Sequence, residues 1–204
     1  MTDIILARHG QTAWNVGEVF RGQSDIELDE TGLKQAQLLA EYLSKRKIEA
    51  VFSSPLQRAL KTAQIVASYH KLEVQVTQGL NDLSFGEWEG KPSKEVQQKY
   101  PVLFAQWVAT PHLVRLPGGD SIDDLTKRAI KLVNEVVEKY QGTVVLVAHR
   151  VVHQALILAL LGLDNSHFWN IRMDTAAITT FIYTQGRFVL TGHNNTSYLQ
   201  SLKK

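Results

Sequence analysis

The stretch that most constrains the fold is the apolar run VVLVA, residues 144–148. A strand with one face in water alternates apolar and polar residues, whereas every residue of this run is apolar. Such a run is typical of a strand that is covered on both faces of a sheet. Helices must then pack on both faces, and this requirement predicts an α/β protein with a mostly parallel sheet.

Strand-like and helix-like segments alternate along the rest of the chain. Helical spacing of apolar residues marks 31–43, a segment after Ser54-Pro55, a long segment from Ser121 and another from about Arg150. Short apolar or alternating runs mark strands at 4–7, 50–53 and 73–76, and a closing hairpin joins 177–183 to 188–191 through Gln185-Gly186. We therefore expect a three-layer α/β/α sandwich around a mostly parallel mixed sheet, with the hairpin at its edge.

Local residues predict several helix boundaries. Ser54 is expected to cap the helix that follows, with Pro55 in its first turn. Ser121 and Asp124 have the spacing of a capping box, and Gly142 is expected to end that long helix. Residues 81–116 lack a clear period, so we expect a single domain, 1–204, with an irregular insertion here that holds two short helices and covers one end of the sheet.

Composition narrows the classes of protein. The chain has 204 residues, a net charge of +2 and no cysteine, which excludes disulfide and thiolate chemistry. The basic clusters 45–47 and 203–204 are short and lack interleaved aromatic residues, so we interpret them as solvated helix ends rather than a nucleic-acid site. The longest apolar run, 151–163, is too short to cross a bilayer, and no secretory signal is visible. We expect a cytoplasmic protein that binds neither nucleic acid nor membrane.

Polar residues follow three of the predicted strands directly. Arg8-His9-Gly10 follows 4–7, Ser53-Ser54-Pro55 with Arg58 follows the second strand, and His149-Arg150 follows 144–148. Because ligands of such sheets bind beyond the carboxyl ends of the strands, we expect two arginines and two histidines to meet there. Arginine donates paired hydrogen bonds to phosphate oxygens, and a neutral histidine nitrogen can attack phosphorus. The pattern therefore predicts a site for phosphoryl transfer.

Plainer interpretations exist for single residues. A histidine that ends a buried strand is more often a core or turn residue, and an arginine near a helix start is more often a surface residue. His149 and His153 are four residues apart and could share a metal on one helix face, but Arg150 stands where a metalloprotease motif has glutamate. A metal ion would also be repelled by Arg8 and Arg58. We therefore expect no metal or other cofactor, with His153 in the core or the pocket wall.

Five blocks together resemble the histidine phosphatase superfamily, in its phosphoglycerate mutase-like branch. They are Arg8-His9-Gly10 with Asn15, the run SSPLQRA at 53–59, FGEWEG at 85–90, PGGDS at 117–121 and VAH at 147–149. They occur in the order of that family and spread over nearly the whole chain. The resemblance implies a phosphoglycerate mutase-like α/β fold and an enzyme that works through a phosphorylated histidine.

The resemblance also implies a role for each matching residue. His9 would be the nucleophile, and Arg8, Arg58 and His149 would bind the phosphoryl oxygens with help from Asn15. Phosphoryl transfer depends mainly on positioning and on stabilising spread negative charge, which a preformed cationic pocket supplies.

The proton donor is a departure from the family pattern. Asp82 stands where the family usually has a glutamate, and we expect it to act as general acid and then as the base for water. Its arm is one methylene shorter, and the plainer interpretation is a turn residue. Glu87 and Glu89 are the competing acids, and Glu89 is expected instead to anchor the loop backbone.

Other departures concern the substrate. Arg150 replaces the glycine that most relatives have after the second histidine, and it either reaches a second anionic group or packs outward. Arg21 and Gly22 lie in the loop after Asn15 and are further candidate substrate contacts. Asp120 replaces a more usual glutamate, and we expect it to help cap the helix.

The short chain and the FGEWEG block resemble the phosphatases of this family more than its mutases. We expect a metal-independent phosphomonoester hydrolase for a small phosphorylated metabolite, with α-ribazole phosphate as one specific substrate. A cofactor-dependent phosphoglycerate mutase is the alternative within the family, and a non-catalytic phosphate-binding module is the alternative outside it. The closing hairpin is a candidate edge for a homodimer.

Overall fold

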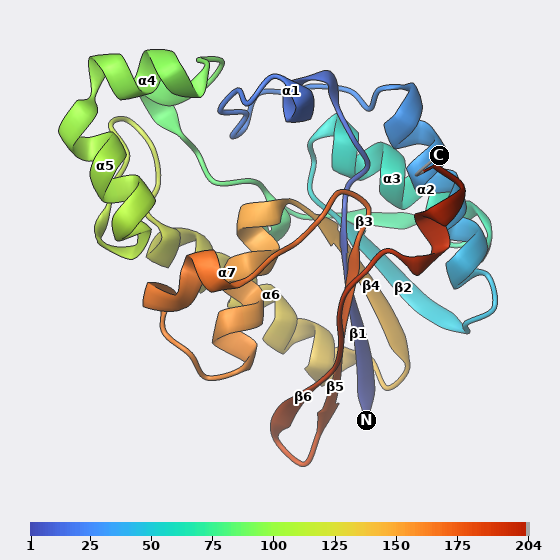
Figure 1. Ribbon diagram of the computed structural model, residues 1–204. Coiled ribbons are helices and arrows are strands. Elements are labelled where there is room, and N and C mark those ends of the chain that lie inside the picture. Colours follow the sequence, from blue (N-terminus) through green and yellow to red (C-terminus); the bar gives the residue numbers. More distant parts are fainter. Residues whose placement is uncertain (203–204) are drawn as a thin grey trace.

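A single six-stranded sheet forms the centre of the computed structural model, which describes residues 1–202 (Figure 1). The basic pair 203–204 lies outside the described residues. The strand order is β3-β2-β4-β1-β5-β6; the first four strands are parallel, and the last two are antiparallel. The strands are β1 (Thr2–Arg8), β2 (Ile48–Ser53), β3 (Val74–Val76), β4 (Thr143–Ala148), β5 (Ile178–Thr184) and β6 (Arg187–Asn195). The predicted mostly parallel mixed sheet is therefore confirmed.

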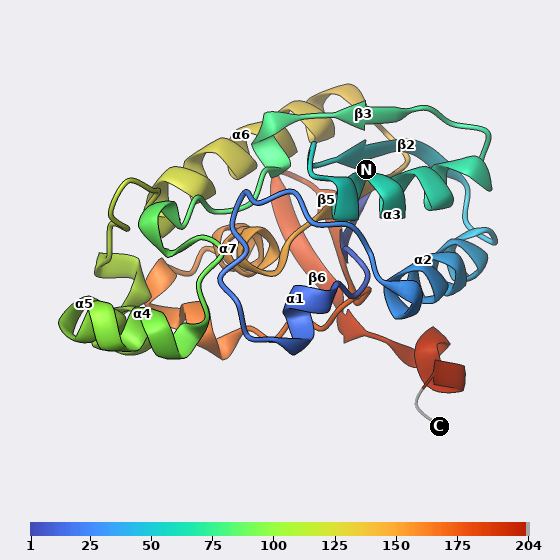
Figure 2. The same cartoon turned by 90° about the horizontal axis from the view of Figure 1, so that it is seen from above.

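Helices cover both faces of the sheet, as Figure 2 shows from above. Helices α2 (Glu30–Leu43) and α3 (Gln57–Ser68) pack on one face, against Ile5 and Ala7 of β1. Helices α6 (Ile122–Lys139) and α7 (Arg150–Leu160) pack on the other face, against Ile4 and Leu6. Successive residues of one strand point to opposite faces, so the apolar run of β4 fills both cores at once, and the three-layer α/β/α prediction is confirmed.

Two of the predicted helix boundaries are wrong. Helix α3 begins at Gln57 with Leu56 at the cap position, so Ser54 does not cap it. The Ser54 hydroxyl lies instead against His149, as described below. Helix α6 ends at Lys139, before Gly142, because the chain is already extended at Tyr140. The capping box at the other end of α6 is confirmed, since Ser121 Oγ accepts from the Asp124 backbone N–H and the Asp124 carboxylate accepts from the Ser121 backbone N–H.

The predicted insertion stands beside the sheet and carries two short helices, α4 (Ser93–Lys99) and α5 (Pro101–Ala109), seen in green in Figure 1. Single 3₁₀ turns flank them at Gln78–Leu80, Gly86–Trp88 and Pro111–Leu113. Aromatic rings hold this part to the main core, with Trp88 fully buried between Phe20 and Trp107. Further short elements are α1 (Ala13–Val16) and 3₁₀ turns at Asn165–Asn170 and Ser197–Leu202.

The closing hairpin turns at Gln185-Gly186, as predicted, and both residues have positive φ, at 50° and 75°. Two successive left-handed residues are typical of the two-residue hairpin turn whose twist matches the flanking strands. Cluster 45–47 follows the end of α2 and is exposed, as expected for a solvated helix end. Within residues 1–202, no helix is both long enough and apolar enough to span a bilayer.

Candidate active site

The carboxyl ends of β2, β4 and β1 meet at one edge of the sheet, as the sequence predicts. Arg8 pairs with Ala148 across β1 and β4, and Ser53 pairs with Val147 across β2 and β4. The ladder continues for one residue beyond the strands, because the His9 N–H donates to the Ala148 carbonyl at 3.0 Å. This bond extends the pairing of β1 and β4 to the first residue of the loop.

His9 is buried and held in one tautomer. Its Nδ1 donates to the Gly10 carbonyl at 2.6 Å, which leaves a lone pair on Nε2. Burial and the charges of Arg58 and Arg8 hold the pKa of His9 well below its usual value. The ring is therefore neutral near pH 7 and carries an unprotonated nitrogen, which is the state that a nucleophile needs.

Gly10 is needed by the close approach of another backbone segment. A Cβ at this position would lie 2.4 Å from the Gly32 carbonyl oxygen, at the start of α2. The Gly10 N–H donates to Thr62 Oγ1 of α3 at 3.3 Å. Helices α2 and α3 thus clamp the loop that presents His9.

Arg58 is fully buried and joins several parts of the site. Its Nη1 donates to the Ser24 carbonyl and its Nη2 to the Gly22 carbonyl, each at 2.8 Å. Nη2 also donates to Asp82 Oδ2 at 3.1 Å. Its Nε donates to His149 Nδ1 at 3.2 Å. The backbone carbonyls fix the guanidinium plane, so its charge stays at the end of β2.

His149 lies beside His9, with ring centroids 5.2 Å apart. Its Nδ1 is 3.5 Å from Asp82 Oδ2, and its Nε2 is 2.8 Å from Ser54 Oγ. Burial, followed by the charge of Arg58, holds the pKa of His149 well below its usual value. The two histidines, Arg58 and Asp82 form one connected cluster, so the structure brings the predicted residues together.

Asp82 faces this cluster and is nearly buried. Its Oδ1 accepts from the Leu83 N–H at 2.9 Å, and its own carbonyl accepts from Arg128 Nη2 at 2.7 Å. Burial raises the pKa of Asp82 despite the opposing charge of Arg58. A carboxyl group that keeps its proton to higher pH is suited to general acid catalysis.

The two competing glutamates lie elsewhere. Glu89 accepts from the backbone N–H groups of Phe85 at 2.9 Å and Gln23 at 3.1 Å, so it anchors the loop as predicted. Glu87 is exposed and accepts from the Tyr100 hydroxyl at 2.5 Å. Among these three acids, only Asp82 reaches the histidine cluster.

Arg8 and Arg21 place further positive charge at the same point. Arg8 Nη1 donates to the Met173 carbonyl at 2.6 Å, while its buried Nε has no hydrogen-bond partner within residues 1–202. Burial and the charges of Arg150 and Arg21 lower the pKa of Arg8 to about 9, and burial lowers that of Arg21 to about 10. Cations that repel one another in this way favour an anion between them.

Asn15 and Gly22 have structural contacts of their own. Asn15 Oδ1 accepts from the Thr12 N–H at 2.9 Å, which stabilises the short helix α1, and the residue lines the cleft described next. Gly22 has φ of +49°, and a Cβ there would lie 2.3 Å from Glu89 Oε1. Its carbonyl accepts from Arg58 Nη2, and the residue also lines the cleft described next.

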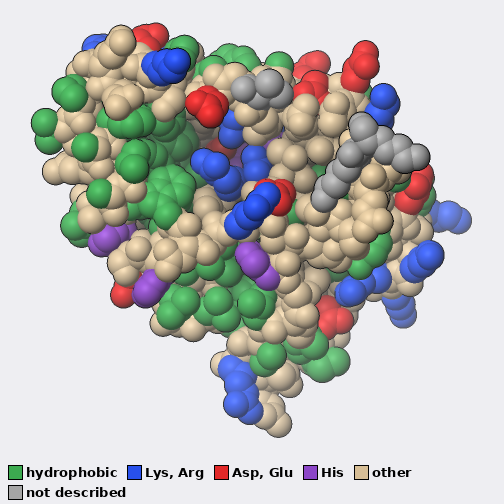
Figure 3. Space-filling model, in the orientation of Figure 1, with side chains coloured by type: hydrophobic (Ala, Val, Ile, Leu, Met, Phe, Trp, Pro, Cys, Tyr) green, Lys and Arg blue, Asp and Glu red, His purple; other side chains and the backbone are tan. Residues whose placement is uncertain are grey.

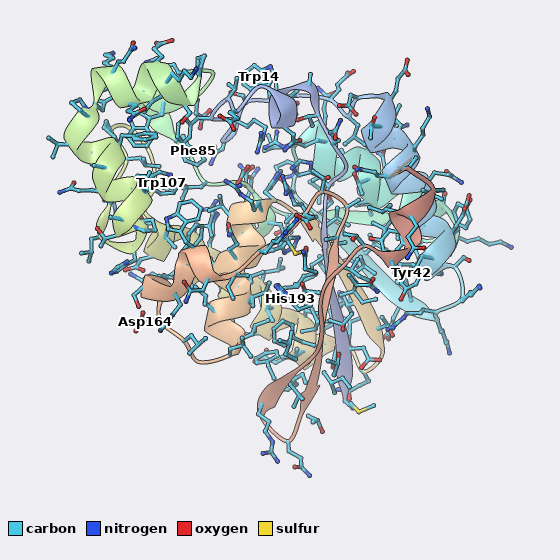
Figure 4. All side chains as sticks on the ribbon, in the orientation of Figure 1. Trp14, Tyr42, Phe85, Trp107, Asp164 and His193 are labelled. Atoms are coloured by element: carbon cyan, nitrogen blue, oxygen red, sulfur yellow. The ribbon has the colours of Figure 1, made fainter. Side chains whose placement is uncertain are left out.

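A cleft of about 1100 Å³ opens over this cluster. Figure 3 shows Lys and Arg side chains gathered in a central hollow, with hydrophobic side chains along one flank. That flank is an aromatic wall, which we define as Phe85, Phe104, Trp107 and Trp169; Figure 4 labels Phe85 and Trp107 on the inner side of the insertion. Arg150 is exposed to the cleft, with its guanidinium carbon 6.0 Å from the centroid of the Trp169 ring.

Two further expectations are settled by these contacts. The expectation that Asp120 helps to cap α6 is wrong. Its carboxylate accepts from the Ser84 N–H at 3.1 Å and pairs with Arg128 at 3.2 Å. His153 is a core histidine, as expected, and its Nε2 donates to the Ala7 carbonyl at 3.0 Å. Over the described part of the chain, no three His, Asp or Glu side chains gather in a way that could hold a metal ion.

Several contacts of the site were missed by sequence reasoning. Arg128 of α6 supports the backbone of Asp82, Trp169 lies under Arg150, and the Met173 carbonyl holds Arg8. Each of these joins segments that are distant in the chain, so no local spacing could have found them. Ser54 could have been predicted as a site residue, because it follows a strand that ends at the site. Its hydroxyl was interpreted as a helix cap instead.

Comparison with known proteins agrees with this geometry. A family model described as the histidine phosphatase superfamily, branch 1, matches residues 4–196. Phosphoserine phosphatase 1 of Hydrogenobacter thermophilus is 36% identical over 200 residues, which cover 98% of this chain and 95% of that protein. Among solved structures, Bacillus stearothermophilus YhfR has a TM-score of 0.94 and 30% identity, covering 98% of this chain and all of that one.

Other solved structures carry names that point to substrates. A mutant phosphoserine phosphatase of Entamoeba histolytica, in complex with phosphoserine, has a TM-score of 0.87 and 32% identity over 98% of this chain and 100% of that one. The α-ribazole phosphatase of Shigella flexneri has a TM-score of 0.87 and 27% identity over 95% of this chain and 96% of that one. These relatives share one fold and differ in the phosphate ester that their names give.

Proposed function

The chain belongs to the histidine phosphatase superfamily and is a phosphatase of the phosphoglycerate mutase family, and from that premise we propose that it hydrolyses a small phosphomonoester through a phosphohistidine at His9, without a metal ion. The observation that carries this proposal is the state of His9. Its ring is neutral, the Gly10 carbonyl accepts its Nδ1 proton, and burial and the charges of Arg58 and Arg8 lower its pKa.

The first step is attack on phosphorus. Nε2 of His9 donates its lone pair to the phosphorus atom, and the bond from phosphorus to the ester oxygen breaks. Arg8 and Arg58 stabilise the charge on the three phosphoryl oxygens, with His149 and Asn15 as further ligands. The buried Nε of Arg8, which has no partner in the described part of the chain, is a donor that such an oxygen can satisfy.

Asp82 supplies the proton that the leaving oxygen needs. It starts protonated, gives its proton to the ester oxygen, and the alcohol departs. In the second step the Asp82 carboxylate removes a proton from water, the oxygen of that water attacks phosphorus, and the bond to His9 Nε2 breaks. The raised pKa of Asp82 supports the first half of this cycle, since it extends the protonated state toward neutral pH.

The cleft favours esters that carry a second negative charge. A phosphoryl dianion matches Arg8 and Arg58, whereas Arg21 and Arg150 face the same cleft and form no ion pair with the acids of the described chain. Phosphoserine and 3-phosphoglycerate each have a carboxylate that can pair with Arg21 and Arg150. α-Ribazole phosphate lacks that charge but has a planar ring that suits the aromatic wall. We therefore propose esters with a carboxylate, rather than α-ribazole phosphate, as the preferred substrates.

The test is hydrolysis of p-nitrophenyl phosphate in EDTA by wild type, His9→Ala, Asp82→Asn and Glu87→Gln. We expect turnover in wild type, none in His9→Ala, and a decrease of about 10²–10⁴-fold in Asp82→Asn. Glu87→Gln is the matched control, because Glu87 is a nearby acid that lies outside the cluster, and it should keep wild-type turnover. When wild type is quenched without acid during turnover, its intact mass should include one added phosphoryl group.

Substrate choice is read from matched pairs of esters. Phosphoserine against phosphoethanolamine, and 3-phosphoglycerate against glycerol 3-phosphate, each differ by a carboxylate. A preference for the first member that is lost in Arg150→Gln supports the second-anion contact. Mutase activity with 3-phosphoglycerate, or phosphate binding without any turnover, would overturn the hydrolase in favour of one of the two alternatives.

A further inference from the structure

Ser54 is a buried polar residue at the site that the reaction scheme above does not use. Its side chain is fully buried at the end of β2, and its Oγ is 2.8 Å from His149 Nε2. The same oxygen accepts from the Leu56 N–H at 3.3 Å. A hydroxyl group can both donate and accept a hydrogen bond. The Leu56 N–H can only donate, and His149 Nε2 donates or accepts according to its tautomer.

The state of His149 follows from its other ring nitrogen. Arg58 Nε always carries a proton, so Nδ1 of His149 can only accept in that 3.2 Å contact. Burial and the charge of Arg58 keep the ring neutral, as described above. Nδ1 also lies 3.5 Å from Asp82 Oδ2, but the contact with the Arg58 Nε–H is shorter, at 3.2 Å. We therefore assign the single ring proton to Nε2, where Ser54 Oγ accepts it.

A phosphoryl group needs the opposite tautomer. Its oxygens only accept hydrogen bonds, so a neutral His149 can bind one through Nδ1 only when Nδ1 carries the proton. Nε2 then has a lone pair in a buried position, and that lone pair needs a donor. Ser54 Oγ is the hydroxyl within reach of it.

We propose that Ser54 is a positioning residue that lets His149 change tautomer when a phosphoryl group binds. The Ser54 hydroxyl turns from accepting the Nε2 proton to donating its own proton to Nε2. The ring loses the proton on Nε2 and gains one on Nδ1 by exchange with water, so its charge stays zero. This inference rests on the proposed function, because it takes the phosphoryl group to lie beside His149.

The chain offers a matched control in the neighbouring residue. Ser53 is also fully buried, but its Oγ donates to the Ser54 carbonyl at 2.8 Å, one residue away along the backbone. Ser53→Ala and Ser54→Ala therefore remove the same atom from adjacent buried positions. Ser54→Thr keeps a hydroxyl group at the site and serves as the rescue variant.

The experiment combines inorganic phosphate binding with ¹⁵N NMR of the histidine rings. In wild type without phosphate, we expect His149 protonated at Nε2, and with saturating phosphate, protonated at Nδ1; His149→Asn identifies its signals. Ser54→Ala should weaken phosphate inhibition of p-nitrophenyl phosphate hydrolysis by about tenfold, since one hydrogen bond to a buried nitrogen is lost. Ser54→Thr should recover most of this loss, and Ser53→Ala should behave as wild type.

The outcomes separate this inference from the proposed function. Unchanged phosphate inhibition in Ser54→Ala, or a His149 ring that keeps its Nε2 proton with phosphate bound, would overturn the role of Ser54 while hydrolysis by wild type stands. A wild type that binds phosphate without hydrolysis removes the proposed function but leaves the tautomer test in place. Thermal unfolding of each variant shows whether Ser54→Ala is folded, and the NMR of wild type decides the point if it is not.

Discussion

Three buried neutral histidines should make the stability of this protein fall sharply below neutral pH. His9, His149 and His153 are at most 1% exposed, and burial holds the pKa of each below the value of 6.5 that an unfolded chain has. For His153 the pKa is lowered to about 4. A base whose pKa is depressed by folding binds more protons when unfolded, so its contribution to stability is present above pH 6.5 and is lost as the pH decreases.

The size of the effect follows from the titration of the unfolded chain. Between pH 7.0 and 5.5 His153, with a pKa of 6.5 in the unfolded state and about 4 in the folded state, contributes about 1.3 kcal/mol. That share alone corresponds to a decrease in Tm of about 2–5 °C for a chain of this length. The lowered pKa values of His9 and His149 act in the same direction, so the decrease of the wild type should be larger. Asp82 acts in the opposite direction, because its raised pKa favours the folded state as the pH falls.

The assay is urea unfolding at the two pH values, with two variants of adjacent residues. His153→Gln keeps an N–H for the Ala7 carbonyl and should reduce the difference between the two pH values by about 1.3 kcal/mol. Gln154→Leu removes a buried amide that does not titrate and should lower stability equally at both. A wild-type free energy of unfolding that changes by less than about 1 kcal/mol, or a difference that His153→Gln leaves intact, would refute the reasoning.

Three further substitutions test the supports of the site. Gly10→Ala places a Cβ 2.4 Å from the Gly32 carbonyl oxygen, and we expect a lower Tm together with at least a tenfold lower kcat for p-nitrophenyl phosphate, because the His9 loop must move. Glu89→Gln weakens the anchor of the Phe85 backbone, and kcat/KM should decrease by about tenfold with normal far-UV circular dichroism. Ser121→Ala removes a helix cap far from the chemistry, so thermal unfolding should show a loss of about 1 kcal/mol while kcat is unchanged.

Much of the fold was predictable because its signals are local or general. The apolar run of β4 is a property of adjacent residues, and the meeting of strand ends is a property of any parallel sheet. Together these two properties predict that Arg8, Arg58 and His149 meet at one edge of the sheet. The position of Asp82 came from resemblance to a family, since nothing in its neighbours in the chain distinguishes an acid from a turn residue.

The rest depended on contacts between distant residues. Ser54 and His149 are 95 residues apart, and Arg128 is 46 residues from the carbonyl that it holds. The helix cap assigned to Ser54 was reasonable from local chemistry, but the hydroxyl has a partner across the sheet instead. Gly142 failed as a helix end for a related reason, since the chain leaves α6 early enough for Tyr140 to pack against Phe52 of β2.

The floor and the wall of the cleft come from different parts of the chain, and this division has a consequence for how the protein can change over generations. His9 and its cationic partners are fixed by strand ends inside the sheet, whereas Phe104 and Trp107 belong to a helix that stands beside it. Mutations in that helix change the wall of the cleft and leave the strand ends that hold His9 in place. Over generations, substitutions in this one peripheral segment can therefore reshape the cleft while the residues at the strand ends are kept.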